Sequence, residues 1–318
     1  MLATFAMTVC GADPTVIIFM LPIALIASEK SKINPMILVV MIMAGSLAGG
    51  TGPVSIIGIV TAGLAQKNGV DIYLPIWFAS LTLQFSVATL TYFILGGWKA
   101  LPHDDLHCAT PEPFNTKQKI ALAIIAFSLI LILGFKIRVG GAMAIGAALM
   151  LVLRVADEKE AIKSVNWGVL LLVGGTGVLV TVMEKAGGVK MLSAFLSSIM
   201  TPETAAPITG MISGFMGFVA SWTGVVAPTL FPTLNGISAN MNGAVHPISL
   251  MQAIQSTGLS VSYSPFSALG AMALASLPAS VDHKKIFNHQ IIIALVFMAW
   301  AMFLNWSGLF KFYVNMFA

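Results

Sequence analysis

The chain has 318 residues, of which 58% are hydrophobic and only 9% are charged. Because a soluble domain averages about 25% charged residues, this composition excludes a water-soluble fold and predicts an all-α polytopic membrane protein. The formal net charge of +4 does not indicate nucleic-acid binding, since the lysines and arginines stand in short clusters between apolar runs, as membrane topology requires.

Apolar runs alternate with short charged turns in the first part of the chain. Residues 2–7 have the composition of the middle of a membrane segment. The pattern then predicts helices at residues 15–28, 33–47, 54–65 and 72–95. A glycine-rich break separates the second of these helices from the third. A polar linker with Pro102, Pro111 and Pro113 follows and divides the chain.

The apolar segments after the linker differ in length, and the lengths predict different roles. Three segments are long enough for membrane spans, and a shorter amphipathic one is expected along the interface. A re-entrant hairpin with Ser221, Trp222 and Thr223 at its tip comes next, then a broken helix and a last span. The predicted elements are residues 120–135, 142–155, 167–183, 189–200, 206–220 with 224–234, 247–259 with 266–277, and 286–306.

The lysines and arginines also predict an orientation, because they are enriched in cytoplasmic loops. If each hairpin returns to its own side, ten of them, including Lys30 and Lys117, fall on one side of the membrane. Six, including Lys67 and Lys185, fall on the other. The linker is therefore predicted to be cytoplasmic and the C-terminus external.

Two segments about 210 residues apart share the pattern Pro-x-Ser-x-x-Gly, and each interrupts an apolar run. A run ending in proline precedes each copy, and 31 residues separate Pro22 from Pro53 while 33 separate Pro232 from Pro265. The chain is expected to cross the membrane an odd number of times between the copies, so the copies face opposite ways. Inverted repeats with broken transmembrane helices and re-entrant hairpins are typical of secondary transporters.

This repeat predicts the domain organisation. Residues 1–97 form a partial first inverted repeat with a hairpin, a broken helix and one span. Residues 98–117 form the cytoplasmic linker, and residues 118–318 form a complete second inverted repeat.

Non-helical backbone inside a bilayer persists only where a cavity, water or an ion satisfies its carbonyl and amide groups. Free carbonyls and hydroxyls at the two breaks suit a hard cation such as Na⁺, whereas the helix N-termini after the breaks and tips suit a carboxylate. The candidate Na⁺ ligands are Thr51, Gly52, Ser55, Ser260, Ser262, Ser264 and Ser267. The candidate substrate ligands are Ser221, Trp222, Thr223, Asp13 and Thr15. No cofactor and no further metal site are expected.

Two of these residues allow a second interpretation. Asp13 is the only carboxylate inside an apolar region, where an acid is a functional hypothesis by default, as a Na⁺ ligand or a carrier of the coupling proton. However, Asp13 followed by Pro14 is also a good helix start. Trp222 either shapes a substrate pocket or anchors the hairpin at the membrane interface.

At the tips and breaks the chain resembles the divalent anion:Na⁺ symporter family of the ion transporter superfamily, and more narrowly the bacterial dicarboxylate and malonate carrier-like permeases. That family has two hairpins with Ser-Asn-Thr tips. Residues 221–223 match the second tip, with Trp222 in place of Asn, whereas residues 12–14 differ from the first tip at all three positions. The segments around Pro53 and Pro265 match the Na⁺-site loops of the family.

The resemblance implies a multi-pass protein of the bacterial inner membrane that works as a homodimer. It covers the whole chain but not the whole family fold, because the N-terminal spans of the first repeat are absent. The chain is therefore expected to be a shortened sequence or one half of a split gene.

The expected function is secondary active transport of small organic anions, di- or tricarboxylates, by Na⁺-coupled symport. The alternatives are an H⁺-coupled carrier or exporter of the same superfamily, and a partial membrane subunit or truncated relic that needs a partner chain. The partners are a small carboxylate anion and the lipid bilayer, with no nucleic acid. An enzyme is not expected, because an intramembrane aspartyl protease needs two facing carboxylates and Asp13 has no partner in the apolar runs.

Overall fold

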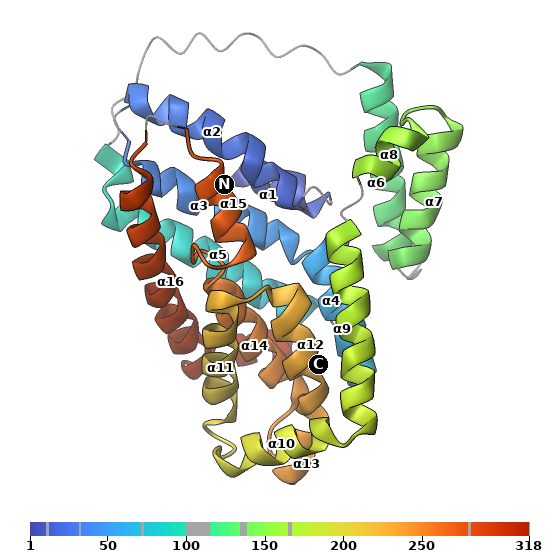
Figure 1. Ribbon diagram of the computed structural model, residues 1–318, viewed down its shortest axis with the longest axis vertical. Coiled ribbons are helices and arrows are strands. Elements are labelled where there is room, and N and C mark those ends of the chain that lie inside the picture. Colours follow the sequence, from blue (N-terminus) through green and yellow to red (C-terminus); the bar gives the residue numbers. More distant parts are fainter. Residues whose placement is uncertain are drawn as a thin grey trace. The chain divides into compact units, whose positions relative to one another are not determined.

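The computed structural model describes residues 1–10, 13–31, 33–70, 73–99, 115–133, 139–164, 167–278 and 281–317. Every regular element in these ranges is a helix, as the composition predicts (Figure 1). Among the described residues, two helices are long and apolar enough to cross a membrane, Leu74–Ile94 and His283–Trp306. Several shorter apolar helices accompany them.

The helices before the linker follow the predicted order, with bounds shifted by a few residues. The elements are α1 (Leu2–Val9), α2 (Asp13–Ser31), α3 (Pro35–Gly50), α4 (Ile56–Lys67), α5 (Leu74–Ile94) and the short η1 (Gly97–Lys99). Helix α3 begins after Asn34, whose side chain accepts a hydrogen bond of 3.0 Å from the Met36 amide. This cap and the following proline explain why the helix starts two residues later than predicted.

The helices after the linker also agree with the predicted order, with two additions. The elements are α6 (Thr116–Leu133), α7 (Val139–Val152), α8 (Glu158–Ser164), α9 (Trp167–Lys185), α10 (Gly188–Ser198), α11 (Ala205–Val219), η2 (Trp222–Val226), α12 (Ala227–Leu230), η3 (Phe231–Thr233), α13 (Leu234–Asn240), α14 (Pro247–Ser260), α15 (Ala268–Ala275), α16 (His283–Trp306) and α17 (Leu309–Phe317). The polar α8 and the terminal α17 were not predicted. The second arm of the hairpin is also longer than predicted, because α13 continues it to Asn240.

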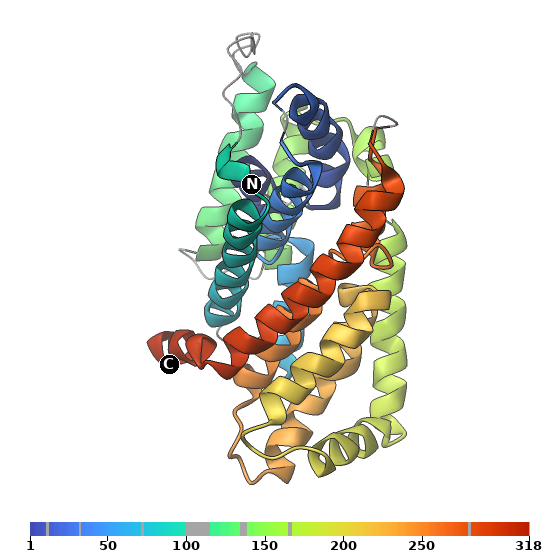
Figure 2. The same ribbon diagram turned by 90° about the vertical axis from the view of Figure 1, so that its left-hand side faces the viewer.

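The structure contains two copies of one arrangement. In the first copy α1 and α2 form the hairpin, α3 and α4 the broken helix, and α5 the following span. In the second copy α11 and the run from η2 to α13 form the hairpin, α14 and α15 the broken helix, and α16 the span. In each copy the first hairpin arm packs against the helix before the break, α1 on α3 and α11 on α14. Figure 2 also shows α11 running beside α16.

Glycines bring these hairpin arms into close contact. On α3, a Cβ at Gly45 or Gly49 would collide with α1, with Thr4 and Thr8 respectively. In the second copy both partners carry such glycines, because a Cβ at Gly210 of α11 would lie 2.9 Å from the Thr257 hydroxyl of α14, and a Cβ at Gly258 of α14 would collide with the Ser213 hydroxyl of α11. Small residues spaced four apart allow such close packing of membrane helices.

The two copies pack against each other crosswise. Helix α4, which follows the first break, contacts α12 and η3 of the second hairpin. Helix α15, which follows the second break, contacts α2 of the first hairpin (Figure 1). In each copy, the half-helix after the break therefore lies against the second arm of the other copy's hairpin.

The chain divides into two compact units that do not coincide with the repeats. One unit comprises Met1–Pro102 and Leu172–Ala318, and the other comprises His103–Leu171. Helices α6, α7 and α8 belong to the second unit, in which α6 packs on α7. The predicted boundary between repeats at residues 98–117 stays a prediction, and most of this linker lies outside the described residues.

Candidate functional site

The two Pro-x-Ser-x-x-Gly segments form the same turn. Ser55 caps α4, and its Oγ accepts a hydrogen bond of 3.3 Å from the Gly58 amide. Ser267 caps α15, and its Oγ accepts one of 3.1 Å from the Gly270 amide. Both hydroxyls donate back to carbonyls of the break, with Ser55 at 2.8 Å from the Gly52 oxygen and Ser267 at 2.8 Å from that of Ser264. The repeated pattern thus encodes a helix cap that starts the second half of each broken helix.

The glycine of each pattern is required by the tightness of this turn. A Cβ at Gly58 would collide with the carbonyl of Gly52, and a Cβ at Gly270 would collide with the carbonyl of Ser264. In both cases the obstructing atoms belong to the backbone, so no side chain can move aside. The first turn of the helix after each break therefore lies in direct contact with the backbone of that break.

Replacing the capping serine should weaken the second break. We expect Ser267→Ala to lower the free energy of unfolding by about 1–2 kcal/mol, because it removes a helix cap and leaves buried break carbonyls without their donor. The matched control is Ser276→Ala at the C-terminal end of α15, where the hydroxyl donates to the Ala273 carbonyl of its own helix. That change should cost less than about 0.5 kcal/mol. Chemical denaturation of both variants in detergent would measure the difference, and equal losses would contradict the capping role.

The first break, residues 51–55, is held by its own side chains and by α5. Thr51 is buried and donates to the Ala48 carbonyl at 3.0 Å. The Gly52 amide donates to the Gly49 carbonyl at 2.8 Å. From α5, the Tyr73 hydroxyl donates to the Thr51 carbonyl at 2.5 Å, and the Trp77 indole donates to the Ala48 carbonyl at 3.2 Å.

The second break, residues 261–267, carries the remaining candidate Na⁺ ligands. Ser260 donates to the Thr257 carbonyl at 2.7 Å, and the Ser262 carbonyl accepts from Ser267 at 2.6 Å. Ser264 donates to the Phe218 carbonyl at 2.8 Å, which ties the break to the first arm of the second hairpin. The three serines of this break and Ser260, the last residue of α14, are all buried.

The tip of the second hairpin places the three predicted substrate ligands together. Ser221 caps the η2 turn, its Oγ accepts from the Gly224 amide at 3.3 Å, and it lies 3.3 Å from the Thr223 hydroxyl. Trp222 is 5% exposed and packs edge-on against Phe231. Its position in the protein interior does not agree with the interpretation of Trp222 as an interfacial anchor. The indole Nε1 has no hydrogen-bond partner among the described residues.

The first hairpin tip is only partly described. Residues 11 and 12 lie outside the described residues, and so do the side chains of Asp13 and Thr15. The backbone of both residues belongs to the first turn of α2. Their assignment as substrate ligands, and the alternative roles of Asp13, therefore stay predictions.

Helix α5 contacts both breaks. Tyr73, at its start, reaches the first break, and Gln84 accepts a hydrogen bond of 2.7 Å from the Tyr263 hydroxyl of the second break. Eleven residues of an α-helix rise about 16 Å. The two breaks therefore lie on one supporting helix, well within the thickness of a bilayer.

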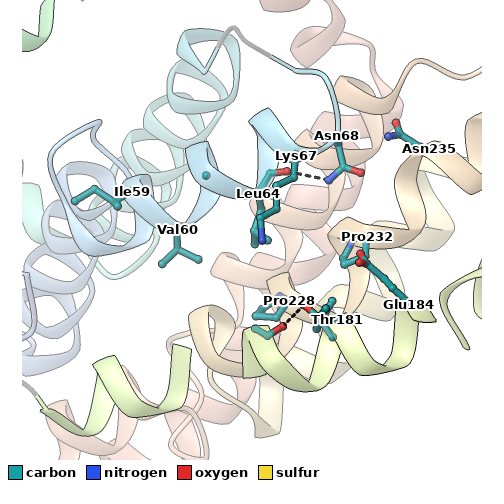
Figure 3. Close-up of a pocket in the computed structure, with 13 residues that line it drawn as sticks. Ile59, Val60, Leu64, Lys67, Asn68, Thr181, Glu184, Pro228, Pro232 and Asn235 are labelled. Carbon is teal, nitrogen blue, oxygen red and sulfur yellow. Dashed lines mark hydrogen bonds between the residues drawn. The ribbon is translucent and has the colours of Figure 1, made fainter. Parts of the chain in front are cut away.

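A cavity of about 680 Å³ lies between the two copies and α9. Its polar lining comprises Lys67, Asn68, Thr181, Glu184 and Asn235 (Figure 3). The apolar lining includes Ile59 and Val60 of α4, and Pro228 and Pro232 of the second hairpin arm. Helix α4 starts just after Ser55, and Ile59 lies one helical turn, about 6 Å, beyond that cap. The cavity thus begins near the first break, while the tip residues 221–223 do not line it.

The sequence interpretation did not single out the polar residues of this cavity. Lys67 and Glu184 stand at helix ends, and of the two only Lys67 entered the sequence analysis, as one of the charges that predict the orientation. They are more than 110 residues apart in the sequence, so nothing local connects them. The only sequence pattern that could have suggested this site was the proline-rich second hairpin arm, with Pro228 and Pro232, across from α4.

The family follows from the sequence as a whole. Residues 1–255 match the model of a family described as citrate transporter. The chain belongs to the citrate transporter family. It is therefore a multi-pass membrane protein of a carboxylate transporter family, and not an enzyme. The match ends within α14, before the second break, and no curated protein matches the chain.

Membership in the citrate transporter family agrees with the expected permease of the ion transporter superfamily. The first break and the second hairpin tip both lie inside the matched range. The family match does not identify the substrate or the coupling ion. The narrower resemblance to dicarboxylate and malonate carriers therefore belongs to the proposed function.

Proposed function

We propose that this chain is a secondary active transporter that moves small di- or tricarboxylates, citrate among them, in symport with Na⁺. The observation that carries the proposal is the identical construction of the two breaks. Both are capped by a serine, both have the following glycine pressed on a break carbonyl, and both rest on α5. Non-helical backbone at membrane depth persists only where it is buried in protein or lines a cavity, and in secondary transporters such breaks lie at the sites for substrate and coupling ion.

The proposed cation ligands are oxygen atoms of the breaks. They are Thr51, Gly52 and Ser55 at the first break, and Ser260, Ser262, Ser264 and Ser267 at the second. A hydroxyl that donates its hydrogen to a carbonyl still has lone pairs that can face a cation. Each break therefore offers carbonyl and hydroxyl oxygens together, the ligand types that a hard cation prefers.

The proposed substrate ligands are the hairpin tips. At the second tip, the hydroxyls of Ser221 and Thr223 and the unpaired indole N–H of Trp222 are donors for a carboxylate. Asp13 and Thr15 are proposed to act at the first tip. Binding of Na⁺ at the breaks would order the tips, and a rigid-body movement would then carry both solutes across by alternating access.

The cavity between α4, α9 and the second hairpin arm supports a solute path. Its volume of about 680 Å³ lies within the range of small-molecule sites. The Lys67 ammonium at its rim can attract an organic anion, while Asn68 and Asn235 can donate hydrogen bonds to it. The first copy, through α4, and the second copy, through its hairpin, thus each contribute to the lining of this path.

Uptake by the purified protein in proteoliposomes tests the proposal. Labelled citrate, succinate and malonate would be offered with an inward Na⁺ gradient, with a proton gradient, and with neither. Accumulation that requires Na⁺ is expected. Uptake driven by the proton gradient would identify H⁺, and not Na⁺, as the coupling ion. Uptake only after addition of a partner chain would favour a partial subunit. No uptake of any carboxylate under any gradient would overturn the proposal.

The proposed homodimer is tested by cross-linking. The proposed inner-membrane location and cytoplasmic linker are tested by labelling of single cysteines.

Two substitutions should separate substrate binding from cation binding. We expect Thr223→Ala to raise the apparent KM for the carboxylate about 5- to 10-fold, as expected for one lost hydrogen bond to a charged group, and Ser262→Ala to raise the Na⁺ concentration for half-maximal uptake by a similar factor. The controls are Thr89→Ala and Ser198→Ala, whose exposed hydroxyls donate to carbonyls of their own helices, those of Phe85 and Phe195. Initial rates at varied Na⁺ and substrate would measure both constants. Unchanged constants in both test variants would contradict the site assignment.

A further inference from the structure

A cavity of about 450 Å³ lies in the smaller unit of the chain, at one end of α6 and α7. The two helices pack side by side, and a Cβ at Gly146 of α7 would collide with the Ser128 hydroxyl of α6 (Figure 1). This packing brings the start of α6, the end of α7 and the start of α8 together around the cavity. The charged residues that line it are Lys117, Arg154, Asp157 and Glu158.

The local backbone does not explain the two cations of this cavity. Lys117 stands in the first turn of α6, where the positive end of the helix dipole disfavours a cation. Arg154 follows the end of α7 and has a φ of +52°, the left-handed conformation that usually holds a glycine. The Val155 amide donates to the Met150 carbonyl at 2.9 Å and closes this turn. A helix C-terminus favours a cation in general, but glycine would fit this position without strain, so the side chain of Arg154 needs a further reason.

The two carboxylates of the cavity have local roles in α8, but they do not neutralise the cations. Asp157 precedes α8, and its Oδ1 accepts hydrogen bonds from the Lys159 amide at 2.9 Å and the Glu160 amide at 3.1 Å. Glu158 stands in the first turn of α8, where an acid is favourable. Within the described part of the chain, no ion pair joins either carboxylate to a cation of the cavity. The cavity therefore presents unpaired charges of both signs.

The cavity lies at the level of the lipid headgroups. Helix α6 has 18 residues and is about 27 Å long, close to the thickness of the hydrocarbon core, so its first turn stands at a membrane surface. Trp167 is 56% exposed, and its indole donates to the Ile162 carbonyl of α8 at 3.3 Å. Exposed tryptophans are typical of that surface. Leu151, which lines the cavity, and the neighbouring Val152 are exposed on α7, where they can contact acyl chains.

We propose that this cavity binds the headgroup of phosphatidylethanolamine. The lipid phosphate lies between Lys117 and Arg154, since a guanidinium binds phosphate oxygens through two hydrogen bonds and an ammonium adds a compact charge. The lipid ammonium lies against Glu158 and against Asp157, which uses only Oδ1 to cap α8. Basic pockets between membrane helices are known binding places for lipid headgroups. The site is separate from the breaks and the hairpin tips, so it does not depend on the solute that is carried.

The charges of the cavity select this headgroup among the common phospholipids. A zwitterion with an N–H donor matches both the cations and the carboxylates. An anionic headgroup such as phosphatidylglycerol would pair with the cations but would be repelled by the two carboxylates. Phosphatidylcholine has a positive charge but no N–H, so it cannot donate a hydrogen bond to a carboxylate.

The experiment measures lipid binding by the whole chain, purified and delipidated in detergent. Phosphatidylethanolamine, phosphatidylglycerol and phosphatidylcholine with the same acyl chains would each be titrated while thermal unfolding is followed. Native mass spectrometry would measure the lipid that stays bound. We expect phosphatidylethanolamine to raise the Tm and to bind about 10-fold more tightly than the other two lipids, the effect of one charge-assisted hydrogen bond.

Arg154→Gly separates lipid binding from stability. Glycine fits the left-handed backbone, so the Tm without lipid should stay the same or rise by about 1–4 °C. Binding of phosphatidylethanolamine should nevertheless weaken about 10-fold or more, and Lys117→Gln should weaken it by a similar factor. Lys163→Gln is the matched control, because Lys163 is an exposed cation of α8 that pairs with Glu160 at 4.0 Å and does not line the cavity. This control should leave lipid binding unchanged.

The carboxylates are tested by a reversal of lipid preference. Asparagine caps a helix as well as aspartate does, so Asp157→Asn combined with Glu158→Gln removes both charges and keeps the start of α8. This double variant should bind phosphatidylglycerol more tightly than phosphatidylethanolamine. Three results for the wild-type protein would overturn the proposal: a preference for phosphatidylglycerol, equal stabilisation by all three lipids, or stabilisation by none. Binding of phosphatidylethanolamine that Arg154→Gly and Lys117→Gln leave unchanged would overturn it as well.

Discussion

Gly58→Ala and Gly270→Ala should each abolish carboxylate uptake by the reconstituted protein. In both variants the new Cβ would collide with a backbone carbonyl of the preceding break, that of Gly52 or of Ser264. The turn must open to accommodate the methyl group, which would displace the break carbonyls and separate the serine cap from its amide. We expect a loss of at least about 3 kcal/mol in the free energy of unfolding, at the upper end of overpacking costs.

Whether the free energy of unfolding falls or rises distinguishes an obstructed glycine from an unobstructed one. In an unobstructed helix, Gly→Ala stabilises by up to about 1 kcal/mol. Gly174→Ala on α9 is the control, since nothing lies within 4 Å of a Cβ built there. It should be neutral or stabilising and should retain uptake. Thermal unfolding in detergent and proteoliposome uptake would be measured for all three variants. A stable, active Gly58→Ala or Gly270→Ala protein would mean that the two turns are not built as described.

Gly258→Ala should displace the tip of the second hairpin. A Cβ at Gly258 of α14 would lie 2.8 Å from Cδ1 and 2.9 Å from Nε1 of Trp222, and it would also collide with the Ser213 hydroxyl. The indole of the tip therefore rests on the backbone of α14. We expect the apparent affinity for the carboxylate to fall about 10-fold or more and stability to fall by about 1–3 kcal/mol.

A double-mutant cycle tests this contact. Trp222→Leu shortens the side chain and leaves room for the new methyl group, so the double variant should recover part of the stability lost in Gly258→Ala. The interaction free energy should reach about 1 kcal/mol or more, as for residues in direct contact. Gly175→Ala, on α9 with open space around it, is the control. Strictly additive effects would show that Trp222 is not seated on Gly258.

Much of the fold could be predicted because its local causes are written in the sequence. Helix breaks at Pro53 and Pro265 follow from proline and glycine inside apolar runs. The capping role of Ser55 and Ser267 is an i to i+3 relation, which explains why the same pattern appears at both breaks. The helix bounds shifted where a cap decided them, as at Asn34 and at Ser267, where α15 starts two residues later than predicted.

Contacts between distant residues could not be predicted in this way. Three contacts join segments more than 30 residues apart: the cavity residues Lys67 and Glu184, the hydrogen bond of Tyr263 to Gln84, and the contact of Trp222 with Gly258. A single sequence carries no information on which helix faces meet, because apolar residues cover most faces of a membrane helix. The same ambiguity explains why Trp222 could be interpreted as an interfacial anchor until its burial was known.

The sequence by itself determined that the chain is a helical membrane protein, that it contains two broken helices, and which hydroxyl residues stand at them. Composition and local backbone chemistry are sufficient for these conclusions, since they concern residues close together in the chain. Only the tertiary structure decided that α5 supports both breaks, and that each half-helix packs on the hairpin of the other copy. These contacts depend on the packing of whole helices, which is set by the sum of many weak side-chain interactions and not by any one segment.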